Sequence, residues 1–587
     1  MKKKYLYFLL LFLTVPQIFA QSDFDLVKIF NINGNVYTHE KIWMQNNKFL
    51  VPISFNTQNY TLESGVIINN PNYQVGQNSF KMLIAQYDEN GQLASHFTLN
   101  STGFELLQDV KVDKNDNIYL TYAVPAGYQL DGQTYFSNVP ESVTKYMMIK
   151  MSKGGIILWK KTFEDGGLMM FNLAVANNGD VFMTARAGQQ NIKVDGITYT
   201  NPTPHQTQTS LTRMVVGKLN TTGSGMHWMS SSTNSVTEAF PNIFVFNNRQ
   251  QVIRVDSQNN VYLLGNLWGM KTTFGSTTLQ NIGLNKEKLF LVKYNANGQV
   301  QWVKSPTIPN NSLHLTPYQF EIDQQDNLFI LEQYHPGFNG NETVNYWGTN
   351  YTTNKAISSL IKLNTSGDIQ WIKKPQVEQS GNSYQCNLIY FAIVNEKILA
   401  FGIFNGSFDY GNGIQINTSG VNKWISIEFN KDGGVDNYNI LDSSFVLAPF
   451  NLIGMDSQKK LWFAQKTGTV GTFNLFIGTL NYNFTIGNSN QKLVYFRSGT
   501  VLLNNDKFQK LDFSIYPNPT QDFIHVIGDD LLNKRYQVYD VTGKIILYGR
   551  LENNKINVES LNSGVYLLKV FNEENSYISN TIKFIKK

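Results

Sequence analysis

The chain has 587 residues and a mass of 66.8 kDa, so it holds either several domains of roughly 100 to 200 residues or one large repeat array. Charged residues make up 16% of the chain, aromatic residues 13% and apolar residues 42%, which excludes global disorder and a coiled coil. The formal charge of +5 is small for this length and gives no support to nucleic-acid binding. The abundance of Phe, Tyr and Gly favours β structure, because aromatic side chains suit pleated surfaces and Gly suits turns.

The first 20 residues have the features of a secretory signal peptide. Lys2, Lys3 and Lys4 are followed by an apolar stretch over residues 5–15 and a short exit that ends at Ala20. This apolar stretch is too short to cross a bilayer as a helix, which takes roughly 20 residues. We therefore expect residues 1–20 to direct export through the general secretion machinery, and we expect no transmembrane segment in the mature chain.

The single cysteine, Cys386, limits how the exported chain can be stabilised. One cysteine cannot form an intrachain disulfide, and a lipid anchor would require a cysteine directly after the cleavage site. We expect Cys386 to be a buried apolar residue and not a catalytic thiol, since the spacing reveals no histidine partner.

A two-part signature recurs between about residues 43 and 484, with a spacing of about 69 residues. Its first part is a turn rich in Asp and Asn followed by an apolar strand, as in KNDNIYLTYA and SQNNVYLLGN. Its second part is an apolar strand, a turn with Gly and a strand that often ends in Trp, as in FLVKYNANGQVQW. The seven first parts have as their first apolar residues Phe49, Ile118, Val181, Val261, Leu328, Ile398 and Leu461.

The tryptophans of the second part keep a fixed register. Trp159, Trp302 and Trp371 each follow a Gly by four residues. Trp228 follows Gly223 by five residues, which indicates one inserted residue in that turn.

Each repeat offers about four short strands that are apolar at consecutive positions, which indicates burial on both faces. A radial stack of four-stranded sheets meets that requirement, because every sheet packs between two others and no long edge is exposed. The sequence therefore predicts an all-β chain with a β-propeller of about seven blades over residues 21–496, with six or eight blades as alternatives. Residues 43–56 contain a first part with no second part before it, so we expect the last blade to be completed by pairing between the two ends of this region. The Gly-to-Trp register and the Asp and Asn turns resemble the propeller repeats of bacterial surface proteins, a resemblance that implies a fold and little about activity.

After a linker over residues 497–511, the pattern changes. Residues 512–587 contain about seven short strands, which predicts a small β-sandwich. The segment YPNP fixes an extended turn before a strand over 523–527, and Asp540 to Lys544 form the turn of a hairpin.

The segments YPNPT, YDVTGK and LNSGVYLLKV, together with the lysine-rich chain end, resemble the type A C-terminal sorting domain of the type IX secretion system. The resemblance implies an Ig-like sandwich that addresses the protein from the periplasm to an outer-membrane translocon. It also implies removal of the domain by a cell-surface sortase, and either release of the cargo or its attachment to an anionic lipopolysaccharide. The residues that match the sorting motifs are Pro517, Asn518, Pro519, Asp540, Gly543, Lys544, Leu561, Gly564, Val565 and Tyr566.

The sequence contains no recognisable catalytic, nucleotide or metal motif, and we expect neither a metal nor another cofactor. The seven histidines are scattered, without H-E-x-x-H spacing. The turns DKNDN at Asp113 and DQQDN at Asp323 lack the Gly and Glu of a calcium loop, so we predict Asx turns there, with calcium as the alternative. Tyr346, Trp347 and Tyr351 lie in a long variable insert; we expect them to cap a blade, although aromatic side chains there also suit stacking on sugars.

Two functional hypotheses follow. The favoured one is a secreted or surface-displayed propeller without catalytic activity, which binds a protein or a glycan on the face formed by its variable loops. The alternative is a propeller enzyme such as a polysaccharide lyase or glycosidase, with residues that converge at the central channel. No catalytic residue can be assigned, because acids brought together in a propeller are distant in sequence.

Overall fold

The computed structural model describes residues 24–587 with gaps, the longest of which are 202–212, 234–251, 281–286, 307–313, 336–341, 378–384, 442–450, 499–512 and 572–578. The described residues form β-strands and turns, as the composition predicts. Within them, no helix is long and apolar enough to cross a membrane. The predicted signal peptide lies outside the described residues. The chain divides into two compact units, Met1–Val501 and Leu502–Lys587.

The N-terminal unit repeats one antiparallel arrangement of four strands, in which the first strand pairs with the second, the second with the third and the third with the fourth. The first copy consists of β2 (Val36–Thr38), β4 (Lys48–Phe55), β7 (Lys81–Asp88) and β8 (Leu93–Thr98), and β3 (Met44–Gln45) also pairs with β4. The second copy consists of β10 (Leu106–Val112), β11 (Ile118–Val124), β14 (Thr144–Met151) and β15 (Ile157–Asp165). The third copy consists of β16 (Met170–Val175), β17 (Val181–Ala187), β20 (Arg213–Leu219) and β21 (Met226–Ser231).

The arrangement continues to the end of the unit. The fourth copy consists of β22 (Val252–Val255), β23 (Val261–Trp268), β26 (Glu287–Tyr294) and β27 (Val300–Lys304). The fifth copy consists of β28 (His314–Ile322), β29 (Leu328–His335), β32 (Ile357–Leu363) and β33 (Ile369–Lys373). The sixth copy consists of β35 (Gln385–Val394), β36 (Lys397–Asn405), β39 (Lys423–Phe429) and β40 (Val435–Leu441). The last copy consists of β41 (Asn451–Met455), β42 (Leu461–Thr467), β45 (Asn490–Ser498) and β1 (Phe24–Asn33). Single parallel bridges, Glu287 to His314 and Ile357 to Cys386, join the fourth, fifth and sixth copies into one sheet of twelve strands.

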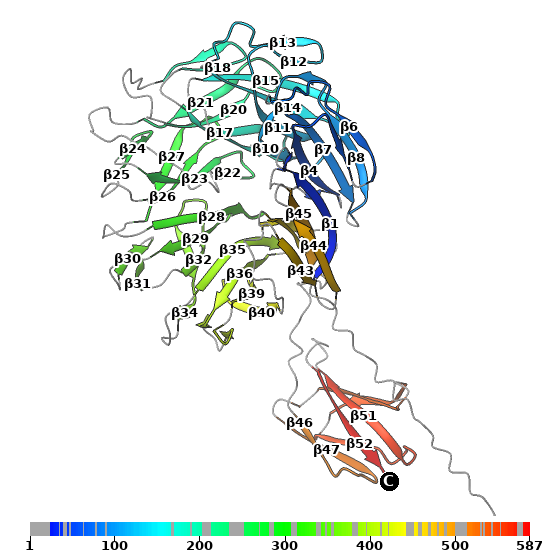
Figure 1. Cartoon of the computed structure of the whole chain (residues 1–587). Helices are drawn as coiled ribbons and strands as arrows, with labels where there is room; N and C mark the ends of the chain where they lie inside the picture. The colour runs from blue at the N-terminus through cyan, green and yellow to red at the C-terminus, as the bar shows by residue number, and fades with distance from the viewer. Residues whose placement is uncertain are drawn as a thin grey trace, which may run out of the picture. The chain divides into compact units, whose positions relative to one another are not determined.

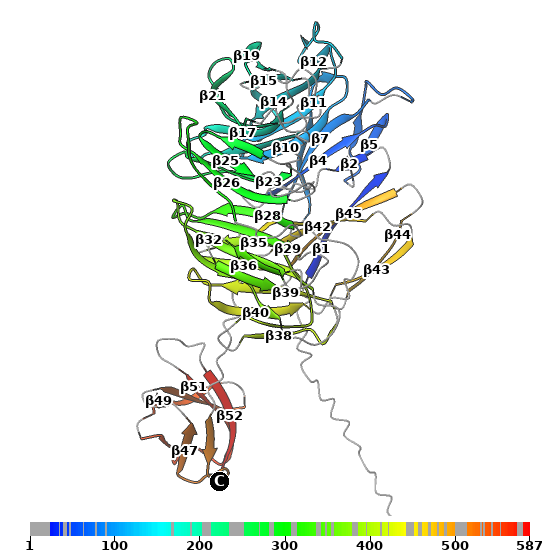
Figure 2. The same ribbon diagram turned by 90° about the vertical axis from the view of Figure 1, so that its left-hand side faces the viewer.

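The last copy takes its fourth strand from the start of the chain. Strand β1 pairs antiparallel with β45, from Phe24 opposite Ser498 to Asn33 opposite Asn490. Both views show the sheets succeeding one another in chain order, with β1 beside β45 (Figure 1, Figure 2). The expectation that the two ends of this region complete one sheet is therefore confirmed.

The first strands of successive copies also lie side by side. β10 contacts β16, β16 contacts β22, β22 contacts β28, β28 contacts β35, and β35 contacts β41, which in turn contacts β3 of the first copy. The second strands are enclosed between neighbouring sheets; β17, for example, is buried at every position. This double burial explains why the strands are apolar at consecutive positions instead of alternating.

The tryptophan of one copy packs on the turn glycine of the next copy. Gly298 has a left-handed backbone with φ 80°, and a Cβ atom there would overlap the indole ring of Trp228. The indole Nε1 of Trp228 also donates a hydrogen bond to the carbonyl oxygen of Ala296 in the same turn, at 2.8 Å. The same packing joins Trp302 to Gly367, Trp371 to Gly433 and, with a phenylalanine in place of tryptophan, Phe97 to Gly155.

The turn before Trp228 contains the inserted residue that its register predicts, and the insertion changes which glycine is left-handed. The left-handed glycine is Gly225, with φ 72°, and not Gly223. The backbone amide of Asn220 donates to the carbonyl of Gly225, five residues on, whereas Asn295 in the next copy donates to Gln299, four residues on.

The segment between the second and third strands of each copy forms a hairpin. These hairpins are β5 (Asn59–Thr61) with β6 (Ile67–Asn69), β12 (Tyr128–Leu130) with β13 (Gln133–Tyr135), β18 (Ile192–Val194) with β19 (Ile197–Tyr199), β24 (Lys271–Phe274) with β25 (Thr277–Gln280), β30 (Glu342–Tyr346) with β31 (Thr349–Thr353), β37 (Ser407–Asp409) with β38 (Gln415–Asn417), and β43 (Gly471–Ile477) with β44 (Leu480–Ile486). Several of them pair with the preceding copy: β12 with β9 (Ser101–Thr102), β18 with β15, and β37 with β34 (Gln376–Val377). These hairpins therefore add a second set of contacts between neighbouring copies.

The C-terminal unit contains two sheets over one core. β46 (Phe513–Tyr516), β47 (Phe523–Gly528) and β50 (Lys555–Asn557) form the first sheet, and β49 (Ile545–Arg550), β48 (Arg535–Tyr539), β51 (Gly564–Phe571) and β52 (Ser579–Lys586) form the second. Ile524 and Val526 from the first sheet and Val538, Leu568 and Phe584 from the second are buried in the shared core. These are the seven short strands that the sequence predicts.

Replacing Gly298 by alanine tests the packing of tryptophan on glycine. Gly298→Ala should lower stability by about 1–2 kcal/mol for the left-handed backbone and by about 1–3 kcal/mol more for the overlap with Trp228. Gly179→Ala is the matched control, because Gly179 has φ 88° and no atom lies within 4 Å of the place that a Cβ would take there. We expect Gly298→Ala to have the lower denaturation midpoint; equal midpoints would show that the indole contact is unimportant.

Candidate functional site

The YPNP loop is fixed to the last strand of the chain by the side chain of Asn518. The Asn518 amide nitrogen donates to the carbonyl oxygen of Lys583 at 3.1 Å, and its amide oxygen accepts from the backbone amide of Ile585 at 2.9 Å. Thr520 continues this pairing, because its amide donates to the Ile585 carbonyl and its carbonyl accepts from the amide of Lys587. Residues 518–520 thus occupy the outer edge of β52. The flanking residues Pro517 and Pro519 are exposed.

The third motif meets the first one through β52. Val565 lies opposite Ile585 in the ladder, and Tyr566 lies opposite Phe584, on which its ring stacks with 5.6 Å between centroids. Tyr566 is buried, and its hydroxyl donates to the carbonyl of Asn562 at 3.0 Å. Gly564 begins β51, and Leu561 lies in the core.

The second motif forms the hairpin turn between β48 and β49. The Asp540 amide donates to the Lys544 carbonyl at 3.0 Å, and the Lys544 amide donates to a carboxylate oxygen of Asp540 at 3.1 Å. Gly543 lies outside the described residues. The motif joins the others through its strand, since Tyr539 lies opposite Leu567 of β51.

In the N-terminal unit, the first strands carry a cluster of charged residues. Arg254 on β22 forms a double hydrogen bond with Glu321 on β28, with Nε to Oε2 at 2.9 Å and Nη2 to Oε1 at 2.6 Å. Both side chains are about 30% exposed. On β10, Lys111 lies 3.2 Å from the buried carboxylate of Asp109. Two acids and two cations therefore face one another as pairs.

The charges of Arg254 and Glu321 hold each other in the ionised state. Burial disfavours both charged forms, but their mutual attraction outweighs it, so the pKa of Arg254 is raised and the pKa of Glu321 is lowered. Gln319 donates a further hydrogen bond to Glu321 at 3.2 Å. A carboxylate that accepts three hydrogen bonds and has a lowered pKa is poorly suited to act as a general acid.

Asp109 of this cluster and Gln319, which is hydrogen-bonded to Glu321, tie adjacent first strands together. Asp109 accepts a hydrogen bond from the backbone amide of Leu173 on β16 at 2.8 Å. The Gln319 amide pairs with both the amide and the carbonyl of Phe391 on β35, each at 2.8 Å. Polar side chains on the first strands thus stabilise the contact between successive copies.

The sequence carries only a weak signal for the residues of this cluster. Lys111, Arg254 and Glu321 each lie between two apolar residues and two positions before the Asp that begins a turn, in VKVD, IRVD and FEID. The pattern alternates as in a strand with one polar face. It does not reveal that Arg254 and Glu321, 67 residues apart, are partners.

The acidic turns are Asx turns, as predicted. The Asp113 carboxylate accepts from the backbone amides of Asn115 and Asn117 at 2.9 Å, from the side chain of Asn117 and from the hydroxyl of Tyr119. These four donors outweigh the effect of burial and lower the pKa of Asp113. Asp256 and Asp323 make the same turn in two other copies. Their carboxylate oxygens are thus engaged by donors of their own turn.

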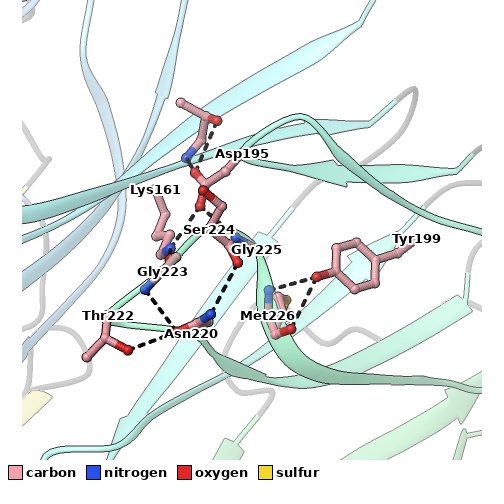
Figure 3. Close-up of polar contacts among 10 residues, drawn as sticks. Lys161, Asp195, Tyr199, Asn220, Thr222, Gly223, Ser224, Gly225 and Met226 are labelled. Atoms are coloured by element: carbon pink, nitrogen blue, oxygen red, sulfur yellow. Dashed lines mark hydrogen bonds and ion pairs between the residues drawn. The ribbon is translucent and has the colours of Figure 1, made fainter.

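A polar cluster joins the second copy to the third. Asp195, in the turn of the β18–β19 hairpin, accepts from the Thr162 amide at 2.9 Å, from Lys161 Nζ at 2.8 Å and from the Gly225 amide at 2.9 Å. Lys161 also donates to the carbonyl of Gly223 (Figure 3). This cluster fixes the turn with the inserted residue, whereas the neighbouring copies are joined by an aromatic ring packed on a turn glycine.

Cys386 is buried on β35, which confirms its prediction as an apolar core residue. Burial raises the pKa of its thiol to about 12, so the nucleophilic thiolate is strongly disfavoured.

Of the aromatic residues in the long insert, Tyr346 and Tyr351 belong to the β30–β31 hairpin, where Tyr346 lies opposite Thr349 and Tyr351 opposite Val344. Trp347 lies outside the described residues. That these rings cap a blade stays a prediction, with stacking on sugars as its alternative.

Comparison with known proteins identifies the C-terminal unit. Residues 514–587 match the model of the secretion system C-terminal sorting domain. No match to the chain was found among curated proteins.

Several solved structures are similar over most of the chain. PorZ of Porphyromonas gingivalis, described as a surface component of the type IX secretion system, is 10% identical over 96% of this chain and 100% of its own, with a TM-score of 0.15. The extracellular domain of a putative one-component system from B. thetaiotaomicron is 10% identical over 96% of this chain and 99% of its own, with a TM-score of 0.14. Prolyl oligopeptidase B from Galerina marginata is 8% identical over 94% of this chain and 56% of its own, with a TM-score of 0.35. Scores this low support no functional conclusion.

The family match and the motif geometry agree on the class. The chain carries a type IX secretion C-terminal sorting domain, and it is exported to the cell surface or secreted.

Replacing Glu321 by glutamine tests the charged pair. Glu321→Gln leaves Arg254 without its countercharge and should lower the free energy of unfolding at pH 7 by about 1–2 kcal/mol, less than for a fully buried pair. Because the folded-state pKa of Glu321 is lowered, this contribution is present above its ordinary pKa and is lost as the pH falls through the lowered value. Denaturant unfolding of both proteins at neutral and acidic pH measures it. Glu396→Gln, at an exposed carboxylate, is the control, and an unchanged stability of Glu321→Gln would contradict the pairing.

Glu332 should show the opposite pH dependence. This residue of β29 is fully buried, and neither carboxylate oxygen has a hydrogen bond of ordinary geometry. Burial raises its pKa well above the usual range, so the folded state keeps the proton that the unfolded state loses as the pH rises. Glu332→Gln should therefore become more stable than the wild type as the pH rises above about 4.5, by up to ~1.4 kcal/mol per pH unit. Thermal unfolding across this range measures the effect; a difference independent of pH would show that Glu332 is ionised in the folded state.

Proposed function

We propose that the N-terminal unit is a β-propeller of about seven blades over residues 21–496, followed by a linker at 497–511 and the sorting domain at 512–587. The recurring order of four antiparallel strands, the side-by-side first strands and the pairing of β1 with β45 support this proposal. A propeller buries both faces of every sheet, which fits the second strands.

The propeller is proposed to be a non-catalytic binding module for a protein or a glycan, displayed on the cell surface or secreted. The ionised state of Glu321 is the main observation that favours a binding module over an enzyme. Glycoside hydrolysis needs one carboxyl group that keeps its proton near neutral pH. Glu321 has a lowered pKa and is neutralised by Arg254, which suits a structural or binding role better.

The alternative is a carbohydrate-active enzyme, a lyase or glycosidase, with a site at the central channel. One observation favours it: Asp109, Lys111, Arg254 and Glu321 all lie on the first strands, which line the channel of a propeller. Charged groups in such a place are candidates for catalysis as well as for binding.

The route after the periplasm is proposed from the motif resemblance. A type IX translocon would carry the chain across the outer membrane, and a surface sortase would remove residues 512–587. The cargo would then be released or attached to lipopolysaccharide.

Binding without turnover is the expected behaviour of the mature chain. Its binding to a panel of immobilised neutral and acidic polysaccharides and surface proteins, and the release of reducing or unsaturated sugar ends from the same polysaccharides, can be measured side by side. We expect retention on at least one ligand class and no new sugar ends. New sugar ends that are lost in Glu321→Gln would establish the enzyme instead, and retention on no member of the panel would count against the binding module.

A further inference from the structure

The second sheet of the sorting domain exposes a row of apolar side chains. The exposed side of β49, β48, β51 and β52, which we call the outer sheet face, carries Ile545, Ile546, Tyr548, Val565, Leu567 and Ile585. Tyr548 is 75% exposed, and Leu567 and Ile585 about 40%. Their strand neighbours Tyr566, Leu568 and Phe584 point into the core. Exposed and buried side chains thus alternate along these strands, and the exposed apolar residues all lie on one face of the sheet.

The ladder register makes this face continuous. Val565 lies opposite Ile585, Leu567 opposite both Tyr539 and Lys583, and Tyr539 opposite Ile545. Side chains opposite one another in a sheet project to the same side and touch. The apolar residues therefore span all four strands instead of lying singly, and contiguous apolar patches of this kind mark interaction sites.

All the charged residues in the strands of the second sheet are cationic. Its four strands contain Arg535, Arg550, Lys569, Lys583 and Lys586 and no acidic residue. Arg535, Arg550 and Lys583 are exposed, whereas the described acids Asp522, Asp540 and Glu559 lie in turns. The outer sheet face is thus an apolar surface edged by cations.

The first sheet differs in how its exposed aromatic residues are covered. Tyr516 stacks on His525 with 5.0 Å between ring centroids, and the ammonium of Lys555 lies 3.7 Å from the ring centroid of Phe523. Ile527, at 54% exposed, offers a single apolar side chain there and a matched control position.

The outer edge of β52 is already occupied. Asn518 and Thr520 pair with its backbone at Lys583, Ile585 and Lys587. A partner therefore cannot extend the sheet along this stretch by adding a strand, which leaves the outer sheet face as the open surface of the domain's last two strands.

We propose that the outer sheet face is the docking surface of the sorting domain for a protein of the export machinery that presents an acidic surface with an apolar centre. The proposal rests on the proposed export route. Apolar contacts at the centre supply affinity, and the surrounding cations steer and orient the partner. A protein fits better than a membrane, because the apolar residues are flat on a sheet and mostly less than half exposed, so they cannot reach into an acyl layer.

Delivery of the full-length chain in a bacterium with a type IX system tests the proposal. Leu567→Thr with Ile585→Thr removes apolar contact, and Lys569→Glu with Lys583→Glu reverses charge, while neither pair alters the core. Ile527→Thr is the control for an exposed apolar residue on the other sheet. Cell fractionation and surface proteolysis measure the ratio of delivered to periplasmic protein. Thermal unfolding of the purified chains verifies that each variant folds.

We expect both double variants to lower the delivered-to-periplasmic ratio about tenfold, the change that ~1.4 kcal/mol of lost docking energy gives, and Ile527→Thr to leave it unchanged. Wild-type delivery of the folded double variants would overturn the proposal. Binding of the purified chain to vesicles of anionic phospholipid that is abolished by Lys569→Glu with Lys583→Glu would also overturn it, in favour of a membrane.

Deletion of residues 512–587 separates this proposal from the export route itself. The deleted chain should stay in the periplasm. If it reaches the surface as well as the wild type does, the export route fails. If it stays in the periplasm while the double variants are delivered normally, the route stands and only the docking surface is wrong.

Discussion

The N-terminal unit depends on the contact between an aromatic side chain of one copy and the turn glycine of the next. Glycine is required at each such turn for two reasons: the backbone is left-handed, and the aromatic ring occupies the place of a side chain. The contact joins four pairs of neighbouring copies, so at those positions the sequence register of Gly and the aromatic residue reflects the packing of one copy on the next. Where the turn has an extra residue, before Trp228, the Lys161–Asp195 cluster joins the copies instead.

Strands and turns could be predicted from the sequence because they are local. The turns at Asp113 and Asp323 follow from residue types, and the pairing between the two ends of the repeat region follows from counting the repeats. The partnership of Arg254 with Glu321 could not be predicted, because it depends on which first strands become neighbours. The left-handed glycine before Trp228 could not be predicted for a related reason: the choice between Gly223 and Gly225 depends on backbone geometry and not on spacing.

In the sorting domain, the motifs have different structural roles that their sequences alone do not reveal. Asn518 replaces a strand neighbour for β52, Asp540 closes a hairpin, and Tyr566 fills the core. Val565, from the same motif as Tyr566, points the other way and belongs to the exposed apolar face. A motif can therefore combine residues that hold the fold with residues that are available to a partner.

The central proposal is that the copies of the N-terminal unit form a closed ring in which every copy packs between two neighbours. Native-state hydrogen exchange of the mature chain tests it most directly, because a closed ring has no end copies that can fray. We predict that the amides of β4, β11, β17, β23, β29, β36 and β42 open with one common free energy. A gradient of protection that decreases from the middle copies toward β4 and β42 would contradict closure.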